Sequence, residues 1–186
     1  MAEPRIKPAI EPTPEVAETL AKLASVDGRP LNIFTTLAHH PLLLKRYLAL
    51  GSVFLGFNQL PARERELVIL RVAWQTKAVY EFGHHTRLGL EAGITPAEIE
   101  RVVQAGLEGW PDADAVLLVA VDELHADDRV GDETWAILAK RFSEAELLEL
   151  LGLIGFYRMT AGLLNSAGVE SERGLAGWPT TAYPGR

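Results

Sequence analysis

Helix-start signals recur from one end of the chain to the other, and they constrain its fold more than any other feature. Thr95 and Glu98 have the spacing of a capping box, and Ser143 and Glu146 repeat it. No segment shows the sustained alternation of apolar and polar residues that marks a half-buried strand. The sequence therefore predicts an all-α fold, a bundle of about eight helices.

Proline and glycine residues separate the expected helices. Pro14, Pro61 and Pro111 stand where the first turn of a helix accepts proline, and Pro41 breaks a longer helical stretch in two. Gly93 stands where a helix end favours a left-handed residue. We expect helices over roughly residues 13–25, 31–57 with a break near Pro41, 61–76, 79–92, 95–107, 111–130, 132–142 and 144–166.

The length of 186 residues fits one domain. Prolines at positions 4, 8 and 12, without apolar periodicity, predict an extended N-terminal arm over residues 1–12. The helical domain is expected over residues 13–168, and glycine and proline residues predict an irregular C-terminal tail over residues 169–186.

Charge and hydropathy exclude several classes of partner. A net charge of -7 and the absence of a dense basic cluster argue against nucleic acid as a partner. The longest apolar run, Ala115 to Val121, is far shorter than the roughly 20 residues that span a bilayer. Residues 1–14 have no apolar segment like that of a signal peptide. We therefore expect a cytoplasmic protein that does not bind membranes.

The chain contains no cysteine, which excludes disulfides, thiolate metal sites and thiol catalysis. It also lacks a glycine-rich phosphate loop, a nucleophile elbow and an HExxH motif. No cofactor is expected on these grounds.

The expected helix over residues 79–92 places two titratable side chains among apolar ones. Glu81 and His85 are one turn apart and fall in the apolar sector of the helical wheel. Burying a carboxyl group and an imidazole is costly unless each has a partner. The side chains expected to face water on the same helix are Tyr80, His84, Arg87 and Glu91.

Three explanations of this pair stay open. Glu81 and His85 form a satisfied buried pair or a contact between subunits; or the carboxylate orients the imidazole for proton transfer near neutral pH; or the pair binds a metal ion together with Glu66 or His40. The spacing of two residues is a weak metal signal, and we expect no metal.

Other polar residues interrupt apolar surroundings. Arg71 and Arg158 lie within apolar helices and need either an acidic partner in the protein or a carboxylate of a ligand. His39 and His40 precede Pro41 at a helix break, where they either sit on the surface or aim into a neighbouring cavity.

Two segments resemble the carboxymuconolactone decarboxylase family, which includes the alkylhydroperoxidase D-like proteins. Residues 60–103 read LPARERELVILRVAWQTKAVYEFGHHTRLGLEAGITPAEIERV, and a later run reads GFYRMTAGLLNSAGV. The resemblance implies an all-helical fold that assembles as trimers or as hexamers built from trimers.

This sequence departs from the family pattern at the two cysteine positions. In the peroxidase branch a glutamate precedes a CxxC pair, and a histidine follows; this frame places Glu66 at the glutamate, Ala78 and Glu81 at the cysteines, and His85 at the histidine. Since both sulfurs are missing, the resemblance does not carry over the peroxidase chemistry.

The decarboxylase branch implies a chemistry that this chain retains. On that resemblance His85 moves a proton, Glu81 or Glu66 orients it, Arg71 or Arg158 binds a substrate carboxylate, and His40 is a further substrate-binding candidate. The implied activity is that of a cofactor-free lyase on a small lactone or carboxylate. The alternative is a non-catalytic oligomeric binding or scaffold protein on the same fold.

Overall fold

The computed structural model describes residues 3–179, so residues 1–2 of the predicted arm and 180–186 of the predicted tail lie outside it. The all-α prediction is confirmed, because the only strands among these residues are two short ones in a hairpin. The helices are α1 (Pro14–Leu20), α2 (Asn32–Leu37), α3 (Pro41–Leu55), α4 (Ala62–Thr76), α5 (Val79–Glu91), α6 (Pro96–Val102), α7 (Asp112–Asp127), α8 (Asp132–Arg141) and α9 (Glu144–Ala167).

Local signals fix the helix ends. Both predicted capping boxes form, at Thr95 with Glu98 and at Ser143 with Glu146. Helix α4 ends at Lys77, whose left-handed backbone (φ 57°) turns the chain at once into α5. This tight connection places the last turn of α4 next to the first turn of α5.

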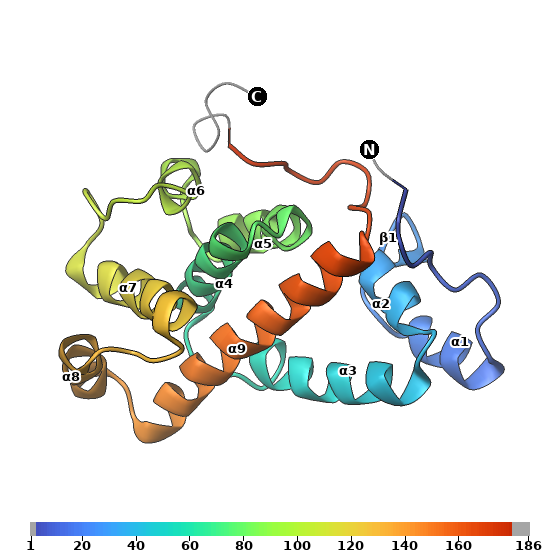
Figure 1. Cartoon of the computed structure of the whole chain (residues 1–186), viewed down its shortest axis with the longest axis horizontal. Coiled ribbons are helices and arrows are strands. Elements are labelled where there is room, and N and C mark those ends of the chain that lie inside the picture. The colour runs from blue at the N-terminus through green and yellow to red at the C-terminus, as the bar shows by residue number, and fades with distance from the viewer. Residues whose placement is uncertain (1–2, 180–186) are drawn as a thin grey trace.

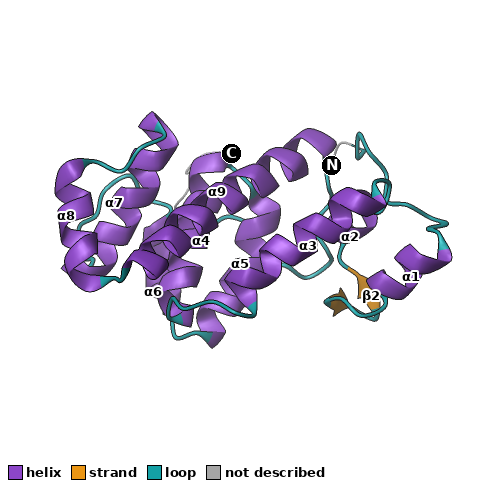
Figure 2. Cartoon of the chain, turned by 90° about the horizontal axis from the view of Figure 1, so that it is seen from below, coloured by secondary structure: helices purple, strands orange, loops and turns teal. Residues whose placement is uncertain are grey.

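Helix α4 lies at the centre of the fold and packs against α5, α7 and α9 (Figure 1). Its residues 66–73 are all buried, as the nearly continuous apolar run predicts. In both cartoons, α7 and α8 lie at one end of an elongated molecule, while α1 and the hairpin lie at the other (Figure 2). The cavity described below lies between α2, α3, α5 and α9.

Helix α9 is the one helix among the described residues that is long and apolar enough to cross a membrane by length and composition. More than half of its most apolar window, 56%, is buried inside the fold. It packs against α3, α4 and α8, so its composition is that of a helix in the core.

Two expected helices are shorter than predicted. The first ends at Leu20, because residues 25–30 form a hairpin of β1 (Ser25–Val26) and β2 (Arg29–Pro30). Asp27 and Gly28 both have positive φ, as a tight hairpin turn requires. The helix expected to reach Leu107 ends at Val102. The hairpin is too short to produce an alternating pattern in the sequence.

The prediction that Tyr80 and His84 face water was wrong, because the segment after α9 covers this side of α5. Both residues are buried. A Cβ added at Gly83 would lie 2.7 Å from the carbonyl oxygen of Ala176, so the segment passes directly over the helix.

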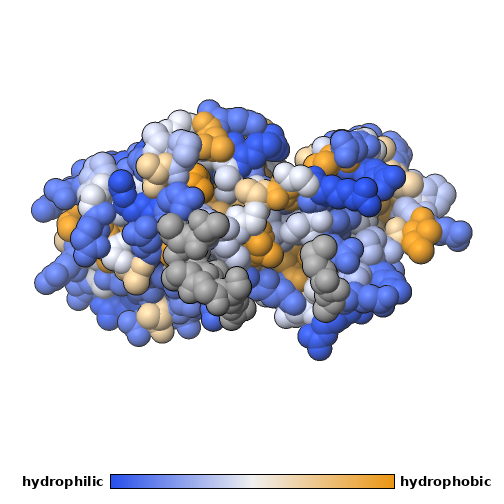
Figure 3. All heavy atoms as spheres, turned by 90° about the horizontal axis from the view of Figure 1, so that it is seen from above, coloured by the Kyte–Doolittle hydropathy of each residue, from blue (hydrophilic) through white to orange (hydrophobic). Residues whose placement is uncertain are grey.

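Seen from above, the surface is mostly hydrophilic, with small separate hydrophobic areas (Figure 3).

Candidate active site

A cavity of about 540 Å³ lies beside the inward face of α5. Its walls are largely apolar and come from α2, α3, α5 and α9, together with the segment before α2. This volume is in the range of small-molecule sites. The polar or titratable residues that line it are Tyr47, Ser52, Tyr80, Glu81, His84, His85, Arg87, Tyr157 and Thr160.

His85 is held from behind by Glu66 of α4. The imidazole Nδ1 lies 2.6 Å from Oε2 of Glu66, whose side chain is 0% exposed. Arg65 Nε donates to the other carboxylate oxygen at 2.9 Å. Burial alone would raise the pKa of Glu66, but the hydrogen bonds and charges of His85 and Arg65 outweigh it and lower the pKa. Glu66 is therefore an ionised acceptor at neutral pH.

This contact sets the role of each ring nitrogen of His85. Because the carboxylate of Glu66 accepts a hydrogen bond, Nδ1 carries a proton. Among residues 3–179, no hydrogen-bond partner occupies Nε2. His85 lines the cavity, so Nε2 is the nitrogen available to a bound molecule.

Glu81 lines the same cavity but has no partner. Its residue is 3% exposed, and neither carboxyl oxygen has a hydrogen-bond partner within the described part of the chain. Burial raises the pKa of Glu81 well above its ordinary value. The two glutamates near His85 therefore differ: Glu66 is a paired carboxylate, whereas burial without a partner in the described residues favours the neutral form of Glu81.

Two of the three tyrosines that line the cavity, Tyr157 and Tyr47, have hydroxyl groups with different surroundings. The ring of Tyr157 meets the His85 imidazole edge-on, with centroids 4.9 Å apart and planes at 89°. No hydrogen-bond partner for its hydroxyl is found among residues 3–179. Tyr47 is 3.0 Å from the hydroxyl of Thr160, which itself bonds the carbonyl of Phe156, so Tyr47 donates to Thr160.

Arg71, a predicted carboxylate-binding residue, does not line the cavity. Its guanidinium is bidentate to Asp122, at 2.8 and 2.6 Å. It also donates to the carbonyls of Val102 and Gln104, at 2.8 and 2.6 Å. The internal ion pair, which the sequence left open, accounts for this arginine, and the geometry gives no support to a role as a substrate clamp.

Arg158 and His40 also lie away from the cavity. Arg158 donates to the carbonyl of Leu124 and to Asp128, at 2.6 and 2.7 Å. Nδ1 of His40 accepts from the backbone N–H of Leu43 and caps α3. His40 lines a separate apolar cavity of about 180 Å³. Neither assignment to the substrate site agrees with this geometry, because both side chains serve local contacts.

Within residues 3–179, no group of three or more histidine, aspartate and glutamate side chains has an arrangement that would hold a metal ion. Glu66 and His85 meet, but Glu81 and His40 are not joined to them by any hydrogen bond. The cavity therefore presents single groups rather than a ligand cluster.

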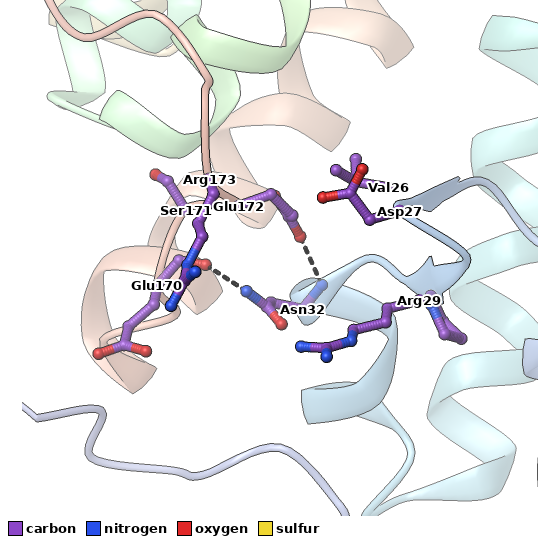
Figure 4. A pocket seen from close by; sticks show the side chains of 9 residues that line it. Val26, Asp27, Arg29, Asn32, Glu170, Ser171, Glu172 and Arg173 are labelled. Atoms are coloured by element: carbon purple, nitrogen blue, oxygen red, sulfur yellow. Dashed lines mark hydrogen bonds between the residues drawn. The ribbon is translucent and has the colours of Figure 1, made fainter.

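The sequence did not single out Glu172, which anchors the segment after α9. It accepts from the backbone N–H of Asn32, the hydroxyl of Tyr80 and Nε2 of His84, at 2.7, 2.9 and 2.6 Å. Figure 4 shows Glu172 and Asn32 facing each other across a second, polar pocket of about 470 Å³ beside the hairpin. The contact with His84 joins residues 88 positions apart, so no local pattern signals it.

Comparisons with known proteins agree with this fold. Residues 41–122 match the model of the carboxymuconolactone decarboxylase family. This range contains α3, α4, α5 and α6 and most of α7, and thus Glu66, Glu81 and His85. A search of curated proteins finds no match.

Solved structures with low sequence identity share the fold. One is the alkylhydroperoxidase AhpD core of an uncharacterised peroxidase-related protein from Ralstonia eutropha, with 17% identity, a TM-score of 0.78, and 92% of this chain and 95% of that chain covered. A peroxidase-related protein from Silicibacter sp. has 20% identity, a TM-score of 0.78, and coverage of 93% and 96%. A variant of the debrominase Bmp8 in complex with tribromopyrrole has 15% identity, a TM-score of 0.68, and coverage of 90% and 91%.

Proposed function

We propose that this chain, whose residues 41–122 match the model of the carboxymuconolactone decarboxylase family, is a cofactor-free acid/base enzyme acting on a small lactone or carboxylate. The observation that carries the proposal is the pairing of His85 with Glu66. A buried carboxylate holds Nδ1 and leaves Nε2 at a cavity of small-molecule size. This is the arrangement of a histidine that takes up and returns a proton.

Each part of the proposed proton transfer has a residue of this chain. Nε2 of His85 removes a proton from a carbon next to a carbonyl, and Glu66 stabilises the imidazolium that forms. Returning the proton to the same or another carbon completes the reaction. Since Arg71 and Arg158 do not reach the cavity, we favour this proton-transfer step over loss of carbon dioxide from a clamped carboxylate.

The alternative proposal is a non-catalytic binding or scaffold protein. It expects Glu81 and His85 to bond each other at a dry interface without a pocket. The partner of His85 is Glu66 instead, Glu81 has no partner among the described residues, and both His85 and Glu81 line a cavity. These observations favour the enzyme.

We also propose that the protein works in the cytoplasm as a homo-oligomer, a trimer or a hexamer. Large apolar side chains are exposed along α3 and just after it, as expected of a surface that a second subunit covers. Size-exclusion chromatography with light scattering measures the oligomeric mass, and a monomer at micromolar concentration would contradict the proposal. The exposed side chains are Leu42, Leu43, Leu50, Val53, Leu55 and Phe57.

The proposed function is tested by a thermal-shift screen of small lactones, dicarboxylates and tricarboxylates. The wild type is compared with His85→Ala and with the control His39→Ala, whose imidazole is exposed and bonded to the carbonyl of Lys7. A ligand that binds the folded state raises the melting temperature. We expect a shift that persists in His39→Ala and is reduced in His85→Ala. The absence of any shift in the three proteins would favour the scaffold.

A further inference from the structure

The charges around the cavity narrow the substrate class. Among the described residues that line it, Arg87 alone carries a permanent positive charge. The side chain of Arg87 is 61% exposed and is paired with Glu91 at 2.9 Å. Within residues 3–179, no permanent cation is therefore held inside the cavity to neutralise an anionic ligand.

Negative charge, by contrast, stands directly behind the cavity wall. Glu66 is a buried carboxylate in contact with His85, and the charge of Arg65, 2.9 Å from its other oxygen, offsets part of its negative charge. A ligand carboxylate placed near Nε2 would lose its hydration in an apolar space and face this charge from the other side of the imidazole. Within the proposed substrate class, the cavity thus disfavours carboxylates and other anionic compounds.

The unpaired groups of the cavity wall match a neutral hydrogen-bond acceptor. Both oxygens of Glu81 are buried, and neither has a hydrogen-bond partner within residues 3–179. The hydroxyl of Tyr157, which lines the same cavity, is also without one in the described chain. Burial raises the pKa of Glu81 and so favours its protonated form, in which Glu81, like Tyr157, offers an O–H donor. A buried donor without a partner is costly, and a ligand carbonyl oxygen would supply the missing acceptor.

We infer that the cavity takes a neutral carbonyl compound, a ketone or an uncharged lactone, whose carbonyl oxygen accepts hydrogen bonds from Glu81 and Tyr157 while His85 faces the adjacent carbon. This inference rests on the proposed function and names its substrate class. Three donors and acceptors of the wall, at Glu81, Tyr157 and His85, then each have a counterpart on the ligand.

The chemistry of this arrangement balances without a co-reactant. The C–H bond next to the carbonyl breaks, its electron pair forms the carbon–carbon double bond of an enolate, and the proton passes to Nε2 of His85. The enolate oxygen gains negative charge where Glu81 and Tyr157 donate, which stabilises it. Return of the proton from Nε2 to carbon gives a neutral product, an isomer when a different carbon receives it.

The test is a binding measurement with three ligands of one skeleton, made by isothermal titration near neutral pH. The probes are benzylacetone, which is a neutral ketone, hydrocinnamate, which is a carboxylate, and phenylpropylamine, which is a cation. We expect benzylacetone to bind at least about tenfold more tightly than either charged probe, since an unpaired buried charge costs more than 1.4 kcal/mol. Equal or tighter binding of hydrocinnamate overturns the inference.

The cationic probe covers the opposite possibility, an ionised Glu81 that pairs with an amine. Tighter binding of phenylpropylamine than of benzylacetone would contradict a neutral ligand. Failure of all three probes to bind would contradict it as well. These comparisons use the wild type alone, so they do not depend on the folding of any variant.

Variants locate the binding energy. Glu81→Gln keeps an N–H donor and should bind benzylacetone nearly as the wild type does, whereas Glu81→Leu and Tyr157→Phe should each weaken it about three- to tenfold. Unchanged binding in both Glu81→Leu and Tyr157→Phe would overturn the assigned donors. His85→Ala separates the two proposals. If the variant still prefers benzylacetone but loses the catalysis that the wild type shows, both proposals are supported. If the preference for benzylacetone survives but the wild type is no more active than His85→Ala, the proposed function alone is refuted.

Discussion

Two buried ionisable residues on neighbouring helices have opposite surroundings. Arg71 of α4 is 1% exposed and uses its donors on Asp122 and on two backbone carbonyls. Glu81 of α5 is 3% exposed and has no partner at either oxygen among residues 3–179. Both interrupt apolar helices, and the sequence alone does not distinguish them.

Whether a buried ionisable group is structural or functional depends on whether the protein itself supplies its partners. Arg71 is fully satisfied inside the protein, so its removal affects folding and leaves nothing for a ligand. Glu81 is unsatisfied beside a cavity, so it lowers stability in the free protein and gains its partner from a bound molecule. Each half of this contrast can be broken by mutation.

The largest expected effect is loss of stability at the satisfied site. Asp122→Ala removes the carboxylate that holds Arg71 and leaves a buried guanidinium, so the free energy of unfolding should fall by about 3–5 kcal/mol. Urea unfolding followed by circular dichroism measures the change. The control is Asp128→Asn, which tolerates the left-handed backbone of this position (φ 55°); its 85% exposed carboxylate pairs with Arg158, and losing the charge should matter by less than about 1 kcal/mol. Similar losses in the two variants would remove the structural half of the contrast.

The next effect has the opposite sign. Glu81→Leu replaces an unpaired buried carboxyl group with an apolar side chain and should raise the free energy of unfolding by about 1–3 kcal/mol. The same variant should lose most of the catalytic activity. Urea unfolding and turnover are measured together, and a variant that is both destabilised and active would show that Glu81 is a structural residue.

The dependence of stability on pH should distinguish Glu81 from its ionised neighbour Glu66. The folded pKa of Glu81 is raised, so the folded state keeps a proton that the unfolded state releases above about pH 4.3. This group therefore makes stability fall as pH rises toward its folded pKa. The pKa of Glu66 is lowered, so its contribution is present above the unfolded pKa and is lost as pH falls through the folded pKa.

Glu81→Gln isolates the first of these two slopes. The urea midpoint of the variant, relative to that of the wild type, should rise with pH from about pH 4.3 upward, because only the wild type carries the raised pKa. Parallel curves for the two proteins would mean that Glu81 is ionised in the folded state.

The smallest expected effect concerns the cover over α5. Gly83→Ala places a methyl group 2.7 Å from the carbonyl of Ala176 and should cost about 1–2 kcal/mol as the segment shifts. Gly155→Ala, a helical glycine with open space around its Cα, should instead stabilise by about 0.5–1 kcal/mol. Amide hydrogen exchange at Tyr80 and His84 reports whether the cover has loosened. Equal effects of the two substitutions would place the segment away from the helix.

Local patterns in the sequence were sufficient to predict the helices. Capping at Thr95 and Ser143 and the break at Pro41 depend on neighbours within four residues, and the structure has all three. The inward direction of Glu81 and His85 follows from the helical period in the same way.

Partners across helices were not predictable in this way. The sequence left both Glu66 and Glu81 as candidates to orient His85, and the packing of α4 on α5 selects Glu66. The burial of His84 depends on Glu172 of the segment after α9, and the occupation of Arg71 depends on Asp122 of α7. These pairings depend on tertiary contacts between distant segments. No short-range spacing in a single sequence indicates them.

The proposed role of His85 is tested most directly by measuring whether this residue moves a proton to and from carbon. Benzylacetone or α-angelica lactone is incubated in D₂O with the wild type, with His85→Ala and with His39→Ala, and loss of the signal of the protons next to the carbonyl is followed by proton NMR. We predict exchange catalysed by the wild type and by His39→Ala, and a rate about 10²–10⁴-fold lower in a folded His85→Ala variant. Equal exchange rates in His85→Ala and the wild type, or no exchange above the protein-free rate, would contradict the account.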